Sequence, residues 1–151
     1  MTPGDIQTDA VVDTNVFVSS LITRTGSPAE VADAFRAGLF PLITSHIQRE
    51  ELGTVLERPR IRSQFLATEP EIAALLEAID RNARFVMPTT ANAPVVRDPK
   101  DQMILATAIA GGAHYLETGD EDLLALSNSD SLPGLRIVTP AAFLAILEDT
   151  N

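Results

Sequence analysis

Short apolar runs alternate with amphipathic segments along the chain. The apolar runs have the length and β-branched content of buried strands, and they cover residues 10–14, 40–45, 84–88, 114–118 and 135–139. Helical spacing of apolar positions predicts helices over residues 16–22, 27–37, 47–57, 71–83, 102–110, 120–127 and 140–147. Such alternation predicts a parallel sheet with helices on both faces. We expect an α/β fold, a Rossmann-like three-layer α/β/α arrangement with a central parallel sheet of about five strands.

Residues that begin or stop helices support these boundaries. Capping boxes with an early Pro are expected at Ser27–Glu30 and Thr68–Glu71. Pro59 should end one helix, Gly111–Gly112 another, and Thr139 should cap the last. Because no repeat or linker interrupts the pattern, we expect one domain over residues 1–151, with residues 1–9 as a flexible N-terminal segment.

Composition narrows the class of protein. The 151 residues are 45% hydrophobic and 21% charged, which is typical of a globular domain with one substantial core. Without any Cys, a disulfide framework, a thiolate metal site and a cysteine nucleophile are excluded. The N-terminus has no secretory signal pattern, and no apolar stretch reaches the roughly 20 residues that span a bilayer. We expect a soluble cytoplasmic protein with no membrane partner.

Four carboxylates carry the chemistry that the pattern predicts. Asp13 and Asp120 follow apolar runs, while Glu51 and Asp101 lie on the helices beside them. Such positions converge on the sheet edge where ligands bind in open α/β folds. Crowded carboxylates repel one another unless a hard cation lies between them, so one or two Mg²⁺ or Mn²⁺ ions are indicated. That arrangement suits metal-assisted phosphodiester hydrolysis.

Each of these residues also has a simpler interpretation. Asp13 could cap a helix or form a turn after the strand. Asp98 could cap a helix beginning at Pro99, with Asp101 in its first turn. The run at 120–122 could be a solvated helix start.

For Glu51, helical spacing decides between it and its neighbour Glu50. Glu51 shares a stripe with Ile47 and Val55, which predicts that it faces the sheet, whereas Glu50 has more polar surroundings. Because a carboxylate on such a stripe is costly to bury, a partner cation is favoured.

Charge opposes a generic interaction with nucleic acid. Eleven basic and 21 acidic residues give a net charge of −10, and acidic residues remain in excess without the four candidate ligands. An RNA substrate would therefore need a local basic strip, for which Arg58, Arg60 and Arg62 are the densest candidates. An acidic surface could instead bind a basic partner.

Several other chemistries are not expected. His46 and His114 form no metal-binding or triad pattern, and we assign them no chemistry. Neither a Walker A loop nor a dinucleotide-binding glycine motif is present. With Tyr115 as the only Tyr and no Trp, we expect no aromatic base-stacking platform.

Four segments in order resemble the PIN-domain nucleases. They are VVDTN, the Ser-to-Pro motif over residues 45–59, RDPKDQMILATA and YLETGDEDLLAL. The resemblance extends from about Val11 to Leu147, and four motifs in sequence are more specific than any one. VLERPRI and RDPKD are similar to a group of toxins of toxin–antitoxin systems, related to VapC-type toxins.

The resemblance implies a Mg²⁺- or Mn²⁺-dependent endoribonuclease. It makes Asp13 the central metal ligand, and Glu51, Asp101 and Asp120 the rest of the acidic quartet. Asn15 and Thr118 match supporting polar positions, and Asp98 would be a capping or outer residue. It further implies an RNA substrate, a cognate antitoxin and, with the apolar helix over residues 72–79, a homodimer.

One position departs from the family pattern, and two alternatives stay open. Glu117 stands where the family more often has an apolar residue; an extra acid there could tighten metal binding or, if buried in the strand, have a raised pKa. A catalytically silent RNA- or protein-binding module could use the acidic cleft for a basic antitoxin segment. An aspartyl-phosphate phosphatase is disfavoured, because Asn15 stands where that class has a second Asp.

Overall fold

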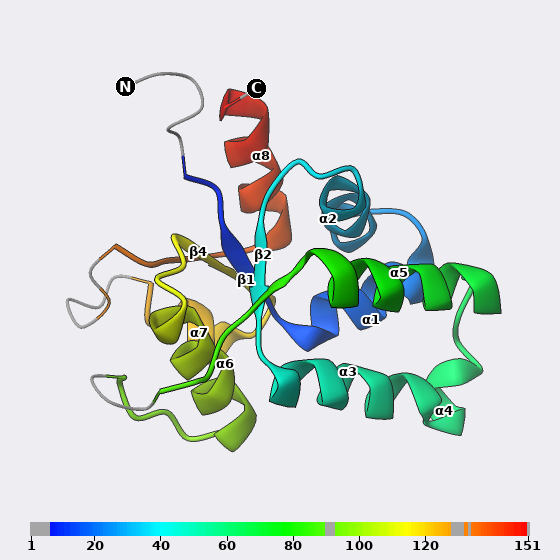
Figure 1. The fold of residues 1–151 in the computed structure, drawn as a ribbon, viewed down its shortest axis with the longest axis horizontal. Coiled ribbons are helices and arrows are strands. Elements are labelled where there is room, and N and C mark those ends of the chain that lie inside the picture. The colour runs from blue at the N-terminus through cyan, green and yellow to red at the C-terminus, as the bar shows by residue number, and fades with distance from the viewer. Residues whose placement is uncertain (1–6, 90–92, 128–131, 133, 151) are drawn as a thin grey trace.

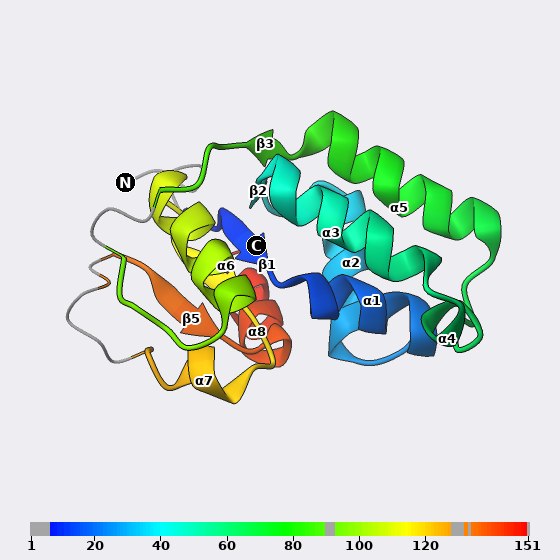
Figure 2. The same ribbon diagram turned by 90° about the horizontal axis from the view of Figure 1, so that it is seen from below.

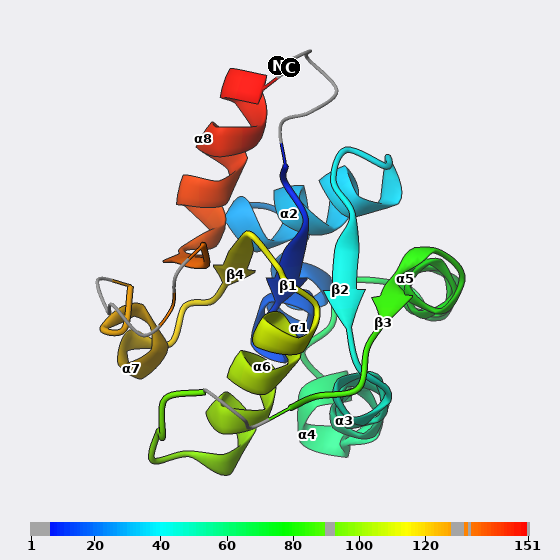
Figure 3. The ribbon, with the colours of Figure 1, turned by 60° about the vertical axis from the view of Figure 1, so that its left-hand side comes forward.

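The computed structural model describes residues 7–89, 93–127, 132 and 134–150, and within these ranges it contains one parallel sheet. Its strands are β1 (Ala10–Val12), β2 (Leu42–Thr44), β3 (Arg84–Phe85), β4 (Tyr115–Glu117) and β5 (Arg136–Val138). The strand order is β3-β2-β1-β4-β5, with every pair parallel. Figure 3 shows β3, β2, β1 and β4 in this order. The expected five-stranded parallel sheet is confirmed, and β1 lies at its centre.

Helices cover both faces of the sheet (Figures 1 and 2). They are α1 (Thr14–Thr23), α2 (Ser27–Arg36), α3 (His46–Glu57), α4 (Pro59–Arg62), α5 (Glu69–Asn82), α6 (Pro99–Ala110), α7 (Glu121–Leu124) and α8 (Pro140–Thr150). Residues of α6 and α7 pack with one face of the sheet, whereas α1, α2, α3, α5 and α8 contribute to the core on the other. The three-layer α/β/α arrangement is therefore confirmed.

Alternation along the strands builds these two cores. In β1, Val11 belongs to the core under α6, while Ala10 and Val12 belong to the core on the opposite face. Register places Val12 beside Glu117, and Glu117 beside Val138. Paired residues of parallel strands share a face, so the Glu117 side chain points to the face opposite α6.

The observed helix ends confirm most of the predicted signals. The Thr68 hydroxyl accepts from Glu71 N at 3.3 Å, and the Thr139 hydroxyl accepts from Ala142 N at 3.1 Å. The capping box at Ser27 is wrong, because Gly26 is the N-cap and Ser27 is already helical. Gly26 has φ +88°, which glycine adopts without a Cβ penalty, so the chain turns one residue earlier than expected.

Some elements differ in length from their predictions. The helix expected from residue 102 begins at Pro99, because Asp98 caps it. The short helix α4, which contains Arg60, was not predicted; it begins at the proline that was expected only to end α3. Residues 1–6, 90–92, 128–131, 133 and 151, which include most of the expected N-terminal segment, lie outside the described residues.

Two further expectations can be compared with the described part of the chain. Here, no helix is long and apolar enough to cross a membrane. The apolar helix that suggested a homodimer is α5; its Leu75 and Ile79 are buried in the core, and Ile72 and Leu76 pack against that core. The apolar face of α5 is thus used within the domain.

Candidate metal centre

Asp13 lies at the carboxyl end of the central strand, where β1 becomes α1. It is the N-cap of α1, and its Oδ1 accepts from Asn15 N at 3.3 Å. Its Oδ2 accepts from the Thr118 hydroxyl at 2.7 Å, and the residue is only 6% exposed. The capping interpretation is therefore confirmed. It does not exclude a ligand role, since each carboxylate oxygen has a second lone pair.

Thr118 connects the ends of two neighbouring strands. Its hydroxyl donates to Asp13 and accepts from Asp120 N at 2.9 Å, and the residue is fully buried. One side chain therefore fixes the Asp13 carboxylate relative to the backbone that carries Asp120. Hydrogen bonds that orient ligands in this way are typical of the outer shell of metal sites.

Asp101, Asp120 and Asp122 bring carboxylate oxygens together at this edge. One oxygen of each lies within 4.8 Å of the others. Asp101 comes from the first turn of α6; Asp120 is the N-cap of α7, where its Oδ1 accepts from Asp122 N at 2.8 Å. Two ligands on opposite sides of Mg²⁺ are about 4.2 Å apart, given bonds of about 2.1 Å, so one hard cation fits these three oxygens with small adjustments.

Asp122 was missed as a candidate ligand in the sequence. It was interpreted only as part of a solvated helix start. The signal was the two-residue spacing from Asp120 across the strand-to-helix turn. Because Asp120 caps α7, the first turn of α7 returns Asp122 to the same side.

The pKa values of Asp101 and Asp13 are both raised, partly by the charges of neighbouring carboxylates. Burial is the main reason that the pKa of Asp101 is raised to about 6, and the charges of Asp120, Asp98, Asp13 and Asp122 add to it. Burial also raises the pKa of Asp13; the hydrogen bonds from Thr118 and Asn15 oppose this, and the charges of Asp120 and Glu51 support it. The neighbouring negative charges therefore disfavour the ionised forms of Asp13 and Asp101, and a divalent cation would relieve that repulsion.

Glu51 lies beside this group but is not one of the three that share a cation-sized space. Its Oε1 is 3.5 Å from Lys100 Nζ, an ion pair that joins α3 to the start of α6. Burial is the main reason that the pKa of Asp13 is raised, and the charge of Glu51 adds a small part. The prediction that Ile47, Glu51 and Val55 all face the sheet is partly wrong, because Ile47 is 50% exposed, whereas Val55 is buried.

Comparisons with known proteins agree with this geometry. A family model described as "PIN domain" matches residues 9–122, a range that contains all the carboxylates described above. The chain belongs to the PIN-domain family. It is also 30% identical over 148 residues to the uncharacterized protein MJ1680 of Methanocaldococcus jannaschii, a match that covers 95% of this chain and 94% of that protein. PIN domains are generally nucleases that use divalent metal ions.

The remaining predicted site residues of this PIN domain have simple structural positions. Asn15 is exposed, and its backbone N–H donates to the capping carboxylate of Asp13. Asp98 is the N-cap of α6, where its Oδ1 accepts from Lys100 N at 2.8 Å, and its charge raises the pKa of Asp101. Both therefore act next to the acidic group through capping.

The basic strip lies away from the acidic group. Arg58 follows α3, Arg60 and Arg62 belong to α4, and all three are exposed. Figures 1 and 2 place α4 at the opposite end of the molecule from α6 and α7. Arg62 is in addition paired with Glu69. An RNA-binding role for this strip stays a prediction, and the structure does not bring it to the carboxylates.

Glu117 is fully buried at the end of β4. Neither of its carboxylate oxygens has a hydrogen-bond partner among the described residues. Burial raises its pKa well above the ordinary value for Glu, as was expected for a position inside the strand. Because its side chain points to the face opposite α6, it does not join the acidic group.

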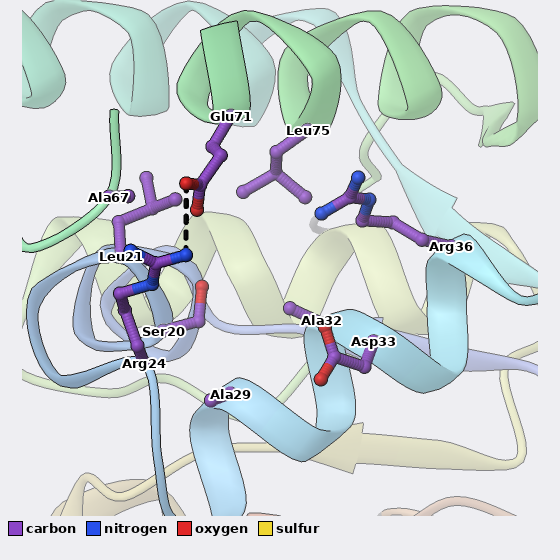
Figure 4. Close-up of a pocket in the computed structure, with 10 residues that line it drawn as sticks. All are labelled: Ser20, Leu21, Arg24, Ala29, Ala32, Asp33, Arg36, Ala67, Glu71 and Leu75. Atoms are coloured by element: carbon purple, nitrogen blue, oxygen red, sulfur yellow. Dashed lines mark hydrogen bonds and ion pairs between the residues drawn. The ribbon is translucent and has the colours of Figure 1, made fainter. Parts of the chain in front are cut away.

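A separate pocket of about 360 Å³ lies between α1, α2 and α5 (Figure 4). Arg24 and Glu71 form an ion pair of 2.9 Å across it, and Asp33 and Arg36 also line it. None of the predicted site residues lines this pocket, and the charges of its lining balance. It therefore does not resemble a cation site.

Proposed function

We propose that this PIN domain is an endoribonuclease that depends on Mg²⁺ or Mn²⁺ and acts as the toxin of a toxin–antitoxin pair. The observation that supports this proposal best is the convergence of Asp101, Asp120 and Asp122 beside the buried Asp13. Oxygen-only donors of this kind suit hard divalent cations, and no Cys competes for a softer metal.

The acidic group would hold one or two cations. Asp101 and Asp122 have no hydrogen bond to their carboxylates among the described residues, so both offer free oxygens. Asp120 uses Oδ1 to cap α7 and keeps its other oxygen, while Asp13 is oriented by Thr118. When bound, the cation would polarise the scissile phosphate and lower the pKa of an attacking water.

Glu51 has a different role in this proposal. Its ion pair with Lys100 places one negative and one positive side chain beside the group. Glu51 would orient water or support a second cation, and Lys100 would meet a phosphate of the RNA. The half-exposed Lys100 ammonium is available for such a contact, since its side chain is 59% exposed.

The variant Asp13→Asn tests the nuclease assignment. Asn caps helices as well as Asp does and can still accept from Thr118, so the fold should survive. Loss of the ligand charge should reduce Mn²⁺-dependent cleavage by more than about a hundredfold, the upper range for outer-shell changes at metal sites. Cleavage is measured on a panel of single-stranded and structured RNAs, with Mn²⁺ or with EDTA.

Glu121→Gln is the matched control for this assay. Glu121 is the exposed acid next to Asp120 and does not belong to the group that could share a cation. This variant should cleave like wild type. Undiminished cleavage by Asp13→Asn would contradict the nuclease assignment. A wild-type chain that neither binds Mn²⁺ nor cleaves RNA would instead be a catalytically silent binding module.

The toxin role needs separate tests. We propose that the protein acts on cytoplasmic RNA and that its acidic surface, with a net charge of −10, binds a basic segment of a cognate antitoxin. Expression of wild type, but not of Asp13→Asn, should stop growth, and co-expression of the neighbouring gene should restore it. Light scattering tests the homodimer that the family resemblance implies.

A further inference from the structure

His46 and Phe85 stack on each other at the edge of the sheet that carries the acidic group. Their ring centroids are 4.6 Å apart and their planes differ by 22°. Phe85 ends the edge strand β3 and packs against the core, whereas His46 begins α3 and is exposed. The imidazole is therefore the more exposed ring of the stack.

One hydrogen bond connects the start of α3, which carries His46, to the residue before Asp13. Gln48, in the first turn of α3, donates through Nε2 to the carbonyl oxygen of Val12 at 3.0 Å. Val12 directly precedes Asp13. Adjacent strands are about 4.8 Å apart, and β3 is two strands from β1, so the stack lies on the order of 10 Å from the end of β1, where Asp13 lies. Asp120 follows β4, on the other side of β1. A single-stranded RNA bound beside Asp13 could therefore place a neighbouring base on the stack.

Two exposed apolar side chains are close in sequence to the members of the stack. Ile47, next to His46, is 50% exposed, and Met87, two residues after Phe85, is 85% exposed. Nucleobases stack on aromatic side chains without sequence preference. Exposed apolar side chains near such a ring could extend the contact with the face of a base.

Overall charge makes such a contact more important. With a net charge of −10, the chain cannot depend on many phosphate contacts to hold RNA. The basic strip at residues 58–62 is at the far end of α3 from His46. Stacking does not require positive charge, and it therefore suits an acidic nuclease.

We propose that the stacked pair His46–Phe85 is a platform for a nucleobase of single-stranded RNA, next to the nucleotide that is cleaved. This inference rests on the proposed ribonuclease function. It replaces the expectation that the chain has no base-stacking platform. The low Tyr and Trp content did not reveal this pair, because it consists of a His and a Phe. These two residues are 39 positions apart in the sequence and meet only after folding.

Binding of a 5′-labelled single-stranded RNA to the Asp13→Asn chain, followed by fluorescence anisotropy, tests the proposal without cleavage. Adding His46→Ala should weaken binding roughly tenfold, within the range for loss of one stacked base. His46→Phe should retain the affinity, because it keeps an aromatic face. His114→Ala is the matched control and should change nothing, since His114 precedes the amino end of β4, whereas the stack and the acidic group lie at the carboxyl ends of the strands.

A substituted RNA separates stacking from a structural role of His46. RNAs that each lack one base, at a different position in each, are bound to the Asp13→Asn chain that retains His46. Binding should be weakened only when the missing base is the one that stacks on His46. That same substitution should cost little in His46→Ala. Equal losses in both chains, or unchanged affinity of His46→Ala, would overturn the proposal and leave the surface to a protein partner.

The two proposals fail in different ways. If the nuclease assignment is wrong, the chain with Asp13 intact cleaves no RNA. If only the stacking proposal is wrong, that chain cleaves RNA, and His46→Ala does so with unchanged KM. If both hold, His46→Ala raises KM roughly tenfold while the Mn²⁺ concentration for half-maximal rate stays the same.

Discussion

Asp13 and Glu117 are buried carboxyl groups at the carboxyl ends of adjacent strands, but their surroundings differ. Their backbones are joined, since Asp13 N donates to the Glu117 carbonyl oxygen at 2.9 Å. Asp13 accepts two hydrogen bonds and faces other carboxylates, whereas Glu117 has no hydrogen-bond partner among the described residues. Burial raises the pKa of both.

The difference shows what marks a candidate metal site. A buried carboxyl with no partner avoids the cost of a charge by keeping its proton, so Glu117 is neutral well above its ordinary pKa. Asp13 has donors that favour its ionised form and acidic neighbours whose charge needs a counterion. Convergent donors and acids, more than burial, therefore distinguish the cation site from an isolated acid in the core.

After Asp120→Asn, the largest effect on Mn²⁺ binding is expected at Asp122. Asp122→Asn should weaken Mn²⁺ binding by roughly tenfold to a hundredfold, because it removes one of three converging carboxylates. Calorimetry of the metal-free protein measures the affinity, with Glu121→Gln as the control from the same helix turn. If the two variants bind Mn²⁺ equally well, Asp122 is only part of a solvated helix start.

An intermediate effect is expected at Glu117. Glu117→Leu should raise the free energy of unfolding at pH 7.5 by about 1–3 kcal/mol, because it replaces an unpartnered polar group in the core. Denaturant unfolding measures this change. Mn²⁺ affinity should be unaffected, because Glu117 does not join the acidic group.

A second variant at residue 117 and a surface control accompany the Glu117→Leu measurement. Leu could be too large for the site, so Glu117→Val is the second variant; Glu121→Leu, on the surface, should change stability by less than about 0.5 kcal/mol. The stabilisation from Glu117→Leu should shrink as the pH falls toward the ordinary pKa of Glu, where the wild-type group keeps its proton in both states. Loss of Mn²⁺ binding in both Glu117 variants would show that this carboxyl belongs to the site after all.

The smallest effect is the pH dependence of the metal-free protein. Asp101 has a folded pKa of about 6 against an ordinary 3.8, so its stabilising contribution is complete below pH 3.8 and is lost as the pH rises through 6. The melting temperature should therefore fall by a few degrees between pH 5 and pH 7.5. Thermal unfolding with EDTA measures this fall.

Asp101→Asn and saturating Mn²⁺ isolate the contribution of the acidic group. Either should reduce the fall in melting temperature, the first by removing the titrating carboxyl and the second by competing with its proton. The remaining fall belongs to Asp13, Glu117 and other titrating groups. An unchanged pH profile in Asp101→Asn would show that its raised pKa has no effect on stability.

Much of the fold could be predicted, because its signals are local. Apolar runs and capping residues such as Thr68 and Thr139 act within a few residues of the sequence. Errors occurred where one residue had two possible roles. Ser27 had the pattern of a cap, but the glycine before it took that position. Pro59 ended one helix and also began another.

The site was harder to predict, because it depends on contacts between distant segments. Asp13, Asp101 and Asp120 could be named from strand ends and motifs. The bond from Thr118 to Asp13 and the arrival of Asp122 beside Asp101 depend on how β4 and α7 pack against β1 and α6. The stacking of His46 on Phe85 likewise requires β2 and β3 to lie side by side.

Calorimetric titration of Mn²⁺ into the metal-free protein at pH 7.5 tests the central claim most directly. Wild type and Glu117→Leu should both show saturable binding, whereas Asp120→Asn should bind more than about a hundredfold more weakly. No saturable binding to wild type, or the same affinity in Asp120→Asn, would contradict a metal centre at the carboxyl ends of β1 and β4.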